Sequence, residues 1–126
     1  ALGGEHRAIL LNKMADALEQ EIPTLMSIIV AEAGRTIADA LAEVREAIDF
    51  CRYYAEQAIK HFSTPISLPG PTGEQNQLSL HGRGVFLCIS PWNFPLAIFT
   101  GQIAAALAAG NSVIAKPASS TPLIET

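Results

Sequence analysis

The spacing of apolar residues along the first half of the chain predicts amphipathic helices. Between residues 5 and 20, apolar side chains recur at steps that place them on one helical face: Leu10, Met14, Ala17 and Leu18. A second helix is expected between Pro23, which is favoured in a first helical turn, and Gly34, which is favoured just after a last one. Thr36 and Asp39 have the spacing of a capping box, and they predict the start of a third helix.

The third helix, expected over 36–62, carries the longest apolar stripe of the chain. Its members follow one another at steps of three or four residues: Ile37, Leu41, Val44, Ile48, Cys51, Ala55, Ala58 and Phe62. The next segment, 63–75, is rich in proline and glycine. It is therefore predicted to be a connection without an element of its own.

The remaining residues have the pattern of an α/β unit. Residues 76–81 alternate polar and apolar, as in a half-buried strand, and 85–89 form a continuous apolar run, as in a strand buried on both faces. A helix that is apolar all round is expected from 95 to 109, followed by a second short buried strand at 113–115. Thr121 and the proline after it predict the start of a further helix.

These elements predict an α/β fold with an N-terminal helical layer and an incomplete Rossmann-like parallel sheet. The helical layer is expected over 1–62, the Pro/Gly connection over 63–75, and the first strands and helix of the sheet over 76–126. Because two parallel strands are too few to be stable alone, the remainder of the same polypeptide is expected to complete the sheet.

Composition adds one unusual feature. Only 16 % of the residues are charged and the net charge is −4, which argues against a nucleic-acid partner. The deficit is local, because no charged residue occurs in the 32 residues of 84–115. A membrane-inserting segment is one alternative there, although prolines and polar residues interrupt the span. Otherwise exposed apolar surface is expected around 85–89 and 96–107, where the rest of the polypeptide would cover it.

Targeting and cysteine patterns favour a cytoplasmic location. The N-terminus lacks the basic and apolar regions of a signal peptide, and the chain has no initiator methionine, as expected of a processed or excised segment. Cys51 and Cys88 are far apart and lack metal-ligand spacing, so no metal site or disulfide framework is predicted. Both cysteines are interpreted as core thiols.

Candidate chemistry lies beyond the carboxyl ends of the two buried strands, where ligands bind in open α/β sheets. After the first strand, Trp92, Asn93 and Phe94 stand between two prolines. At the end of the second, Lys116 is placed to reach ribose hydroxyls or a phosphate. Trp92 and Phe94 could instead be packing residues, Asn93 a turn residue and Lys116 a solvated loop charge. Residue type alone therefore leaves a ligand-binding role and a structural role open.

Longer motifs around these residues resemble a known enzyme family, and this resemblance favours a functional role for them over a packing role. The segments Ile89–Leu96 (ISPWNFPL) and Gly110–Ala118 (GNSVIAKPA) look like those of the aldehyde dehydrogenase superfamily. The segments Ala42–Phe50 and Leu80–Phe86 narrow the likeness. They resemble the L-glutamate γ-semialdehyde (1-pyrroline-5-carboxylate) dehydrogenase module of bifunctional bacterial proline-utilization proteins. The chain would then be an N-terminal piece of a dehydrogenase module and part of its NAD-binding domain.

The resemblance implies NAD(P)-dependent oxidation of L-glutamate γ-semialdehyde to L-glutamate in proline catabolism, through a thiohemiacetal on a cysteine. It implies that Asn93 donates a hydrogen bond to the oxyanion and that Phe94 flanks the substrate channel. It also implies a set of cofactor contacts from Ile89, Ser90, Pro91, Trp92, Lys116, Ala118 and Ser119.

Two departures from the family pattern matter. Ser119 stands where the family often has a glutamate that binds the ribose 2′-hydroxyl, so NADP stays open beside NAD. The family's nucleophilic cysteine and basic glutamate have no match in these residues, so the 126-residue polypeptide alone is expected to be inactive. FAD is implied only if a proline dehydrogenase domain lies upstream, and such a domain could also associate the protein with a membrane.

The sequence leaves two alternative functions open. Another aldehyde, such as succinate semialdehyde, is the runner-up substrate within the same family. A helical interaction module without chemistry is the alternative outside it, with the long helix as its binding surface. The expected partners are a small aldehyde and, for the full-length protein, further copies of itself in a homo-oligomer.

Overall fold

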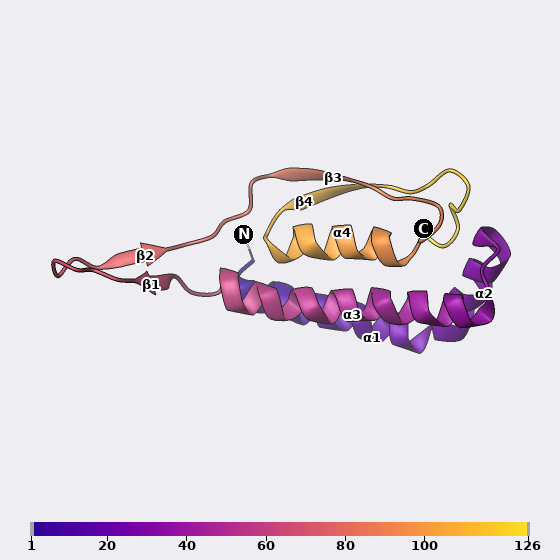
Figure 1. The fold of residues 1–126 in the computed structure, drawn as a ribbon, viewed down its shortest axis with the longest axis horizontal. Coiled ribbons are helices and arrows are strands. Elements are labelled where there is room, and N and C mark those ends of the chain that lie inside the picture. Colours follow the sequence, from indigo (N-terminus) through magenta and orange to yellow (C-terminus); the bar gives the residue numbers. More distant parts are fainter. Residues whose placement is uncertain (1, 126) are drawn as a thin grey trace.

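The structure is a computed structural model, and it describes residues 2–125. Its elements follow in the order α1 (Gly4–Gln20), α2 (Ile22–Ala33), α3 (Ile37–Phe62), β1 (Ile66–Leu68), β2 (Asn76–Leu78), β3 (Val85–Ile89), α4 (Ala97–Ala108) and β4 (Ser112–Lys116). Helices α1 and α3 form one layer, α4 lies on that layer, and β3 and β4 cover α4 from the other side (Figure 1). The predicted helical layer and βαβ unit are both present.

Helix α1 packs on α3 through small residues. Its buried face consists of Gly4, Ala8, Leu11 and Ala15. The predicted stripe was partly wrong: Leu10 is 53 % exposed and Ala17 is exposed, whereas Met14 and Leu18 are half-buried against the core. A Cβ atom on Gly4 would lie 2.4 Å from the carbonyl oxygen of Ala58, which shows how closely the two helices approach. Close approach selects the face with the smallest side chains, which a count of large apolar residues does not detect.

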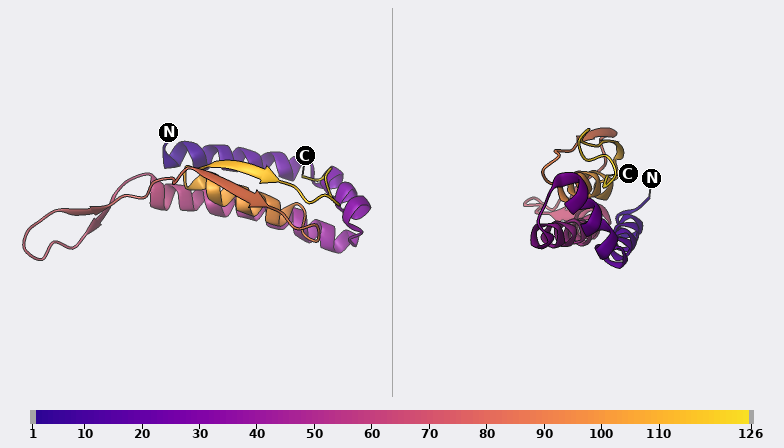
Figure 2. Two further views of the ribbon diagram at one scale, coloured as in Figure 1. Left: turned by 90° about the horizontal axis from the view of Figure 1, so that it is seen from above. Right: turned by 90° about the vertical axis from the view of Figure 1, so that its right-hand side faces the viewer.

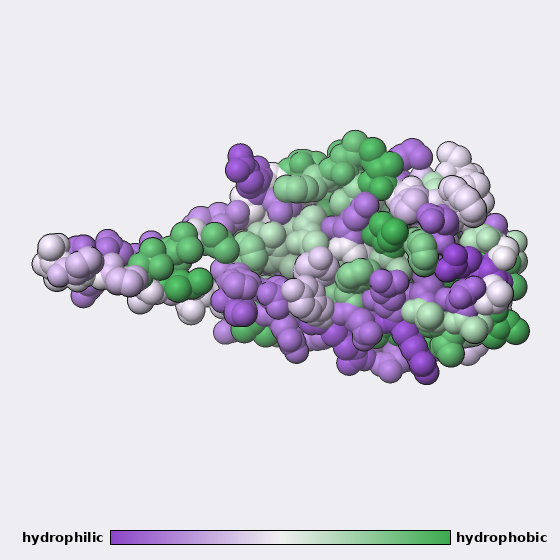
Figure 3. Space-filling view, viewed as in Figure 1, coloured by the Kyte–Doolittle hydropathy of each residue, from purple (hydrophilic) through white to green (hydrophobic). Residues whose placement is uncertain are grey.

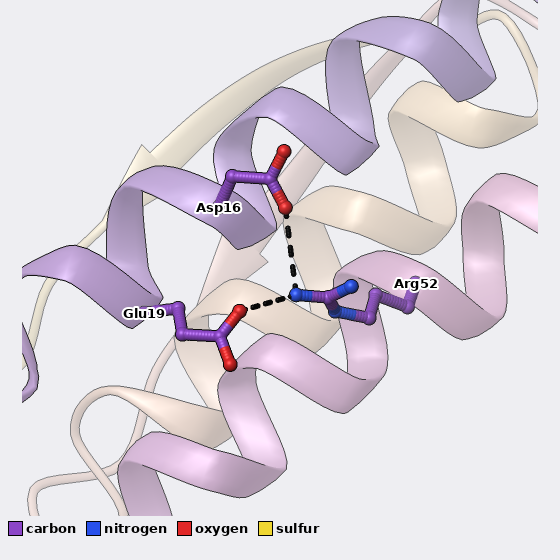
Figure 4. A network of polar contacts seen from close by, with 3 residues as sticks. All are labelled: Asp16, Glu19 and Arg52. Atoms are coloured by element: carbon purple, nitrogen blue, oxygen red, sulfur yellow. Dashed lines mark hydrogen bonds and ion pairs between the residues drawn. The ribbon is translucent and has the colours of Figure 1, made fainter.

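An ion-pair network also joins the two helices on their solvent side. The Arg52 guanidinium on α3 lies 2.5 Å from a carboxylate oxygen of Glu19 and 3.4 Å from one of Asp16, both on α1 (Figure 4). All three side chains are well exposed, so the network contributes at most about 1 kcal/mol to the free energy of unfolding. The buried face, not this network, holds α1 in place.

Helix α3 is the central element of the core. The Thr36 hydroxyl accepts a hydrogen bond from the Asp39 backbone N–H, which confirms the predicted helix start. Most of the predicted stripe is buried, but Ile37 is 71 % exposed because it precedes the part of the helix that other elements cover. Cys51 is buried, as expected of a core thiol, and burial raises the pKa of its thiol to about 11.

Strands β1 and β2 form an antiparallel hairpin that projects from one end of the molecule (Figure 2). The expectation that 63–75 holds no element was wrong, because β1 lies within it. Strand β2 is shorter than the predicted 76–81, is exposed, and pairs with β1, not with β3. A three-residue strand between Pro65 and Pro69 is too short to give a periodic signal. The division of the chain into three parts stays a prediction.

Strands β3 and β4 are parallel, as predicted, with Val85 opposite Ser112 and Ile89 opposite Lys116. Asn111 fixes the start of both strands: its side-chain oxygen accepts hydrogen bonds from the backbone N–H groups of Arg83 (2.6 Å) and Gly84 (3.2 Å). The carboxyl ends of the two strands therefore lie together at the opposite edge.

The outer face of this two-stranded sheet is apolar and exposed. Val85, Leu87 and Ile89 are more than half exposed, and Figure 3 shows the apolar patch over β3. This part of the predicted exposed surface is confirmed. The prediction for 96–107 was largely wrong, because α1 and α3 cover α4 from below and the sheet covers it from above. Among the described residues, no helix is both long and apolar enough to span a bilayer.

Candidate functional site

Two loops meet beyond the carboxyl ends of β3 and β4, residues 90–96 and 117–125. Both lie at the end of the molecule where α2 joins α3 (Figure 1). The Ser90 backbone N–H donates to the carbonyl oxygen of Lys116 at 3.2 Å, which extends the ladder by one bond and joins the two loops. The structure thus brings together the two segments from which we predicted chemistry.

The first loop presents an indole and an amide to solvent. Trp92 is 58 % exposed and Asn93 is also exposed. Ser90 is buried, and its hydroxyl donates to the carbonyl oxygen of Pro91 at 3.3 Å. Asn93 is therefore free to donate hydrogen bonds to a bound group, which a neutral primary amide does without a change of protonation.

Residues from the helical layer hold the end of this loop. The Arg35 guanidinium, between α2 and α3, lies 4.6 Å from the centre of the half-buried Phe94 ring, which is a cation–π contact. One carboxylate oxygen of Glu43 accepts hydrogen bonds from the backbone N–H groups of Leu96 (2.8 Å) and Ala97 (3.4 Å). Neither Arg35 nor Glu43 was among the residues predicted for the site.

Glu43 is an acid in the core. It is only 2 % exposed, and its second carboxylate oxygen is buried without a hydrogen-bond partner among the described residues. Burial raises the pKa of the Glu43 carboxyl because desolvation disfavours the charged form, and the two backbone hydrogen bonds and the charge of Arg35 oppose that rise. The signal that could have identified it is its spacing, three residues after Ala40 and four before Ala47, which puts it on the same helical face as these two buried residues.

Lys116, the last residue of β4, lies directly before the second loop and is exposed. Its ammonium group donates to the carbonyl oxygen of Pro117 at 2.8 Å. Ala118 is buried, and its N–H donates to a carboxylate oxygen of Glu125 at 3.2 Å, which the Thr121 hydroxyl also contacts. Residues 122–125 form turns in place of the helix predicted from Thr121. The ammonium group of Lys116 thus keeps two further donors for a ligand.

The donor set at this edge suits a ligand rich in hydroxyl and phosphate groups. Lys116 supplies a cation, Ser119 an exposed hydroxyl, and the loop after β3 an exposed indole and amide. A nucleotide cofactor presents these groups, and α/β sheets bind such cofactors at their carboxyl edge. The residues present therefore fit NAD, and a lysine also tolerates the additional phosphate of NADP.

Comparison with known proteins decides the family. The model of the aldehyde dehydrogenase family matches residues 1–126. The chain belongs to the aldehyde dehydrogenase family. This membership favours a segment of an enzyme over a helical interaction module.

Within this family, the chain is similar to proteins of two kinds. The chain is 54 % identical to the bifunctional protein PutA of Klebsiella aerogenes over 120 residues, which is 95 % of this chain and 8 % of that protein. It is 40 % identical over 120 residues to the 1-pyrroline-5-carboxylate dehydrogenase of Bacillus subtilis (strain 168), again 95 % of this chain but 23 % of that protein. The chain therefore spans less than a quarter of these two curated relatives.

Solved aldehyde dehydrogenase structures show the same arrangement. A mutant of proline utilization A (PutA) from Bradyrhizobium japonicum matches with a TM-score of 0.94 and 54 % identity, over 99 % of this chain and 13 % of that one. A 1-pyrroline-5-carboxylate dehydrogenase from Thermus with bound NAD matches with a TM-score of 0.89 and 39 % identity, over 98 % of this chain and 24 % of that one. The α/β architecture predicted from the sequence is confirmed as that of an aldehyde dehydrogenase segment.

Proposed function

We propose that this chain is the segment of an L-glutamate γ-semialdehyde dehydrogenase that carries the oxyanion donor and part of the cofactor site. The observation that carries the proposal is that Asn93 follows β3 and Lys116 ends β4, two adjacent parallel strands whose ends the hydrogen bond from the Ser90 N–H to the Lys116 carbonyl oxygen joins. Relatives named PutA and 1-pyrroline-5-carboxylate dehydrogenase support glutamate semialdehyde as the aldehyde.

Asn93 would act on the charge that develops during the reaction. When a nucleophile attacks an aldehyde, the carbonyl oxygen becomes negative, and a fixed donor stabilises it more in the transition state than in the ground state. The Asn93 amide is exposed for this task. Phe94, held by Arg35, would form one wall of the aldehyde channel. The nucleophile would come from residues other than these 126, because neither of the buried cysteines Cys51 and Cys88 matches the family's nucleophile motif.

The cofactor contacts would come from both loops. Lys116 would bind ribose hydroxyls, Ser119 would face the 2′ position, and the buried Ala118 would pack beneath them. The remaining contacts would come from the segment Ile89, Ser90, Pro91 and Trp92. NAD supplies the hydride acceptor when it is bound. Because Ser119 places no carboxylate at the 2′ position, we propose that NADP is also accepted.

Further properties are proposed for the full-length protein. We propose that it forms a homo-oligomer in the cytoplasm and binds no nucleic acid through this segment. FAD binding and membrane association are proposed only if a proline dehydrogenase domain lies upstream of this segment. The 126-residue polypeptide alone would not oxidise aldehydes.

Substrate preference tests the proposed reaction. The full-length protein is expected to reduce NAD⁺ with glutamate semialdehyde at a kcat/KM about 10-fold or more above that with succinate semialdehyde. The measurement is absorbance of the reduced cofactor with each aldehyde in turn. A higher kcat/KM with succinate semialdehyde would favour the runner-up, and reduction with neither aldehyde would contradict the proposed function.

Replacing Lys116 by alanine is expected to weaken cofactor binding. Loss of hydrogen bonds from a charged group costs about 1.5–3 kcal/mol, so the Kd for NAD⁺ should rise about 10-fold or more. Isothermal titration of the full-length protein with NAD⁺ measures this change. Lys60→Ala is the matched control, since Lys60 is an exposed lysine on α3 far along the chain from the two loops. An unchanged Kd in Lys116→Ala would remove Lys116 from the cofactor site.

A further inference from the structure

We infer that Glu43 is a positioning residue for Asn93: its buried carboxylate fixes the first turn of α4 and, through it, the loop that presents the Asn93 amide. The inference rests on the proposed function of Asn93. Glu43 touches no reacting atom in this account, and it acts through the backbone of Leu96 and Ala97.

The first turn of α4 has few ways to satisfy its backbone donors. The first N–H groups of a helix have no partner within the helix, and a Ser, Thr, Asp or Asn at the N-cap normally accepts from them. Here the N-cap is Leu96, which has no capping side chain, and Pro95 has no N–H. The Leu96 and Ala97 N–H groups both donate to the Glu43 carboxylate. The next N–H, of Ile98, donates to the carbonyl oxygen of Phe94.

The cap comes from a different layer, and this determines what it controls. A local N-cap side chain would fix only the conformation of the turn. Glu43 lies in the second turn of α3, so its two hydrogen bonds also fix where the turn lies relative to the helical layer. Asn93 is three residues before Leu96, with the rigid Pro95 between them. A shift of the turn would therefore move the Asn93 amide.

A second contact from the same layer holds the other side of the loop. Arg35, which precedes α3, contacts the Phe94 ring directly next to Asn93. The charged groups that act on the Glu43 carboxyl are Arg35, which favours its ionised form, and Glu46, which opposes it. One layer thus holds both the ring and the backbone that follow Asn93.

Steady-state kinetics of the full-length protein tests the inference through a double-mutant cycle. Glu43→Ala is expected to lower kcat about 10- to 100-fold, because a misplacement of about 1 Å has an effect of that order, while the KM for the aldehyde changes little. In an Asn93→Ala background, Glu43→Ala should lower kcat by less than about threefold, because the group it positions is already absent. Equal loss in both backgrounds would overturn the inference.

Conservative variants keep the test decisive if Glu43→Ala does not fold. Glu43→Gln retains an acceptor oxygen and is expected to keep kcat within about threefold of wild type. Glu43→Asp shortens the side chain by one methylene, and it should lower kcat more than Glu43→Gln despite keeping the charge. The reverse order would contradict positioning by geometry. Glu56→Gln, an exposed glutamate on the same helix, is the matched control.

A crystal structure of the Glu43→Ala or Glu43→Asp protein separates this inference from the proposed reaction. We expect the Asn93 amide to be displaced by about 1 Å relative to wild type, a shift large enough to affect catalysis. An undisplaced amide would overturn the inference whatever aldehyde the protein oxidises. If the wild type does not oxidise glutamate semialdehyde, only the proposed substrate fails, and the cycle is run with an aldehyde that it does oxidise.

Discussion

Replacing Asn93 by alanine should lower kcat of the full-length enzyme by about 10²–10³-fold, the usual effect of removing one oxyanion donor. The loss should appear in kcat and in kcat/KM alike, because the missing hydrogen bond forms mainly in the transition state. Since Asn93 is exposed, its truncation leaves no cavity in the core. Steady-state NAD⁺ reduction with glutamate semialdehyde measures the effect.

The control for this variant is an asparagine elsewhere on the surface. Asn12 is exposed on α1, in the helical layer and not in either loop, and Asn12→Ala should keep wild-type kinetics. The affinity of Asn93→Ala for NAD⁺ should also be close to wild type, because the assigned role of Asn93 is toward the aldehyde oxygen. A kcat equal to wild type would remove the oxyanion role of Asn93.

Replacing Ile29 by alanine should locally destabilise the helical layer by about 2–5 kcal/mol, the range for large-to-small changes in a core. Ile29 is fully buried in the cluster that contains Val44, Ala47 and Ile48 of α3, and it is the one buried residue of α2. Its truncation should loosen α2, which lies beside the two loops of the candidate site (Figure 1).

Amide hydrogen exchange of the full-length protein measures this effect element by element. Peptides from 22–33 should exchange about 30-fold faster or more in Ile29→Ala than in wild type. The adjacent residue supplies the control: Val30 is exposed, and Val30→Ala should leave the exchange almost unchanged. Equal acceleration in the two variants would contradict the packing described for α2.

Local patterns were enough to predict most elements. The helix starts at Thr36 and near Pro23, the helix end at Gly34, and the strand–helix–strand order after residue 85 all follow from neighbours within a few residues. Gly34 ends α2 as predicted, and its φ of 64° is a left-handed conformation that glycine adopts at little cost. A parallel pair also followed from the continuous apolar runs.

What could not be predicted depends on contacts between distant residues. Which face of α1 is buried depends on how closely Gly4 approaches Ala58, more than fifty positions away. The strand at 66–68 has no periodic signal of its own, and it exists because it pairs with 76–78. Glu43 and Arg35 join the site only when α3 packs against the loop after β3.

The candidate site also contains residues that local sequence predicts and residues that it does not. Asn93 and Lys116 were found because strand ends can be located from the sequence and because the surrounding motif resembles a family. The residues that hold the loop in place lie outside that motif. An acid on the buried face of a helix needs a buried hydrogen-bond partner, and Glu43 is an example.

The central claim is that the carboxyl ends of β3 and β4 form the cofactor and oxyanion site. A crystal structure of the full-length protein with NAD⁺ tests it most directly. We expect the Lys116 ammonium to lie about 3 Å from the ribose hydroxyls and the Asn93 amide to face the bound aldehyde or the nucleophile. NAD⁺ bound away from Lys116, with Asn93 facing bulk solvent, would contradict it.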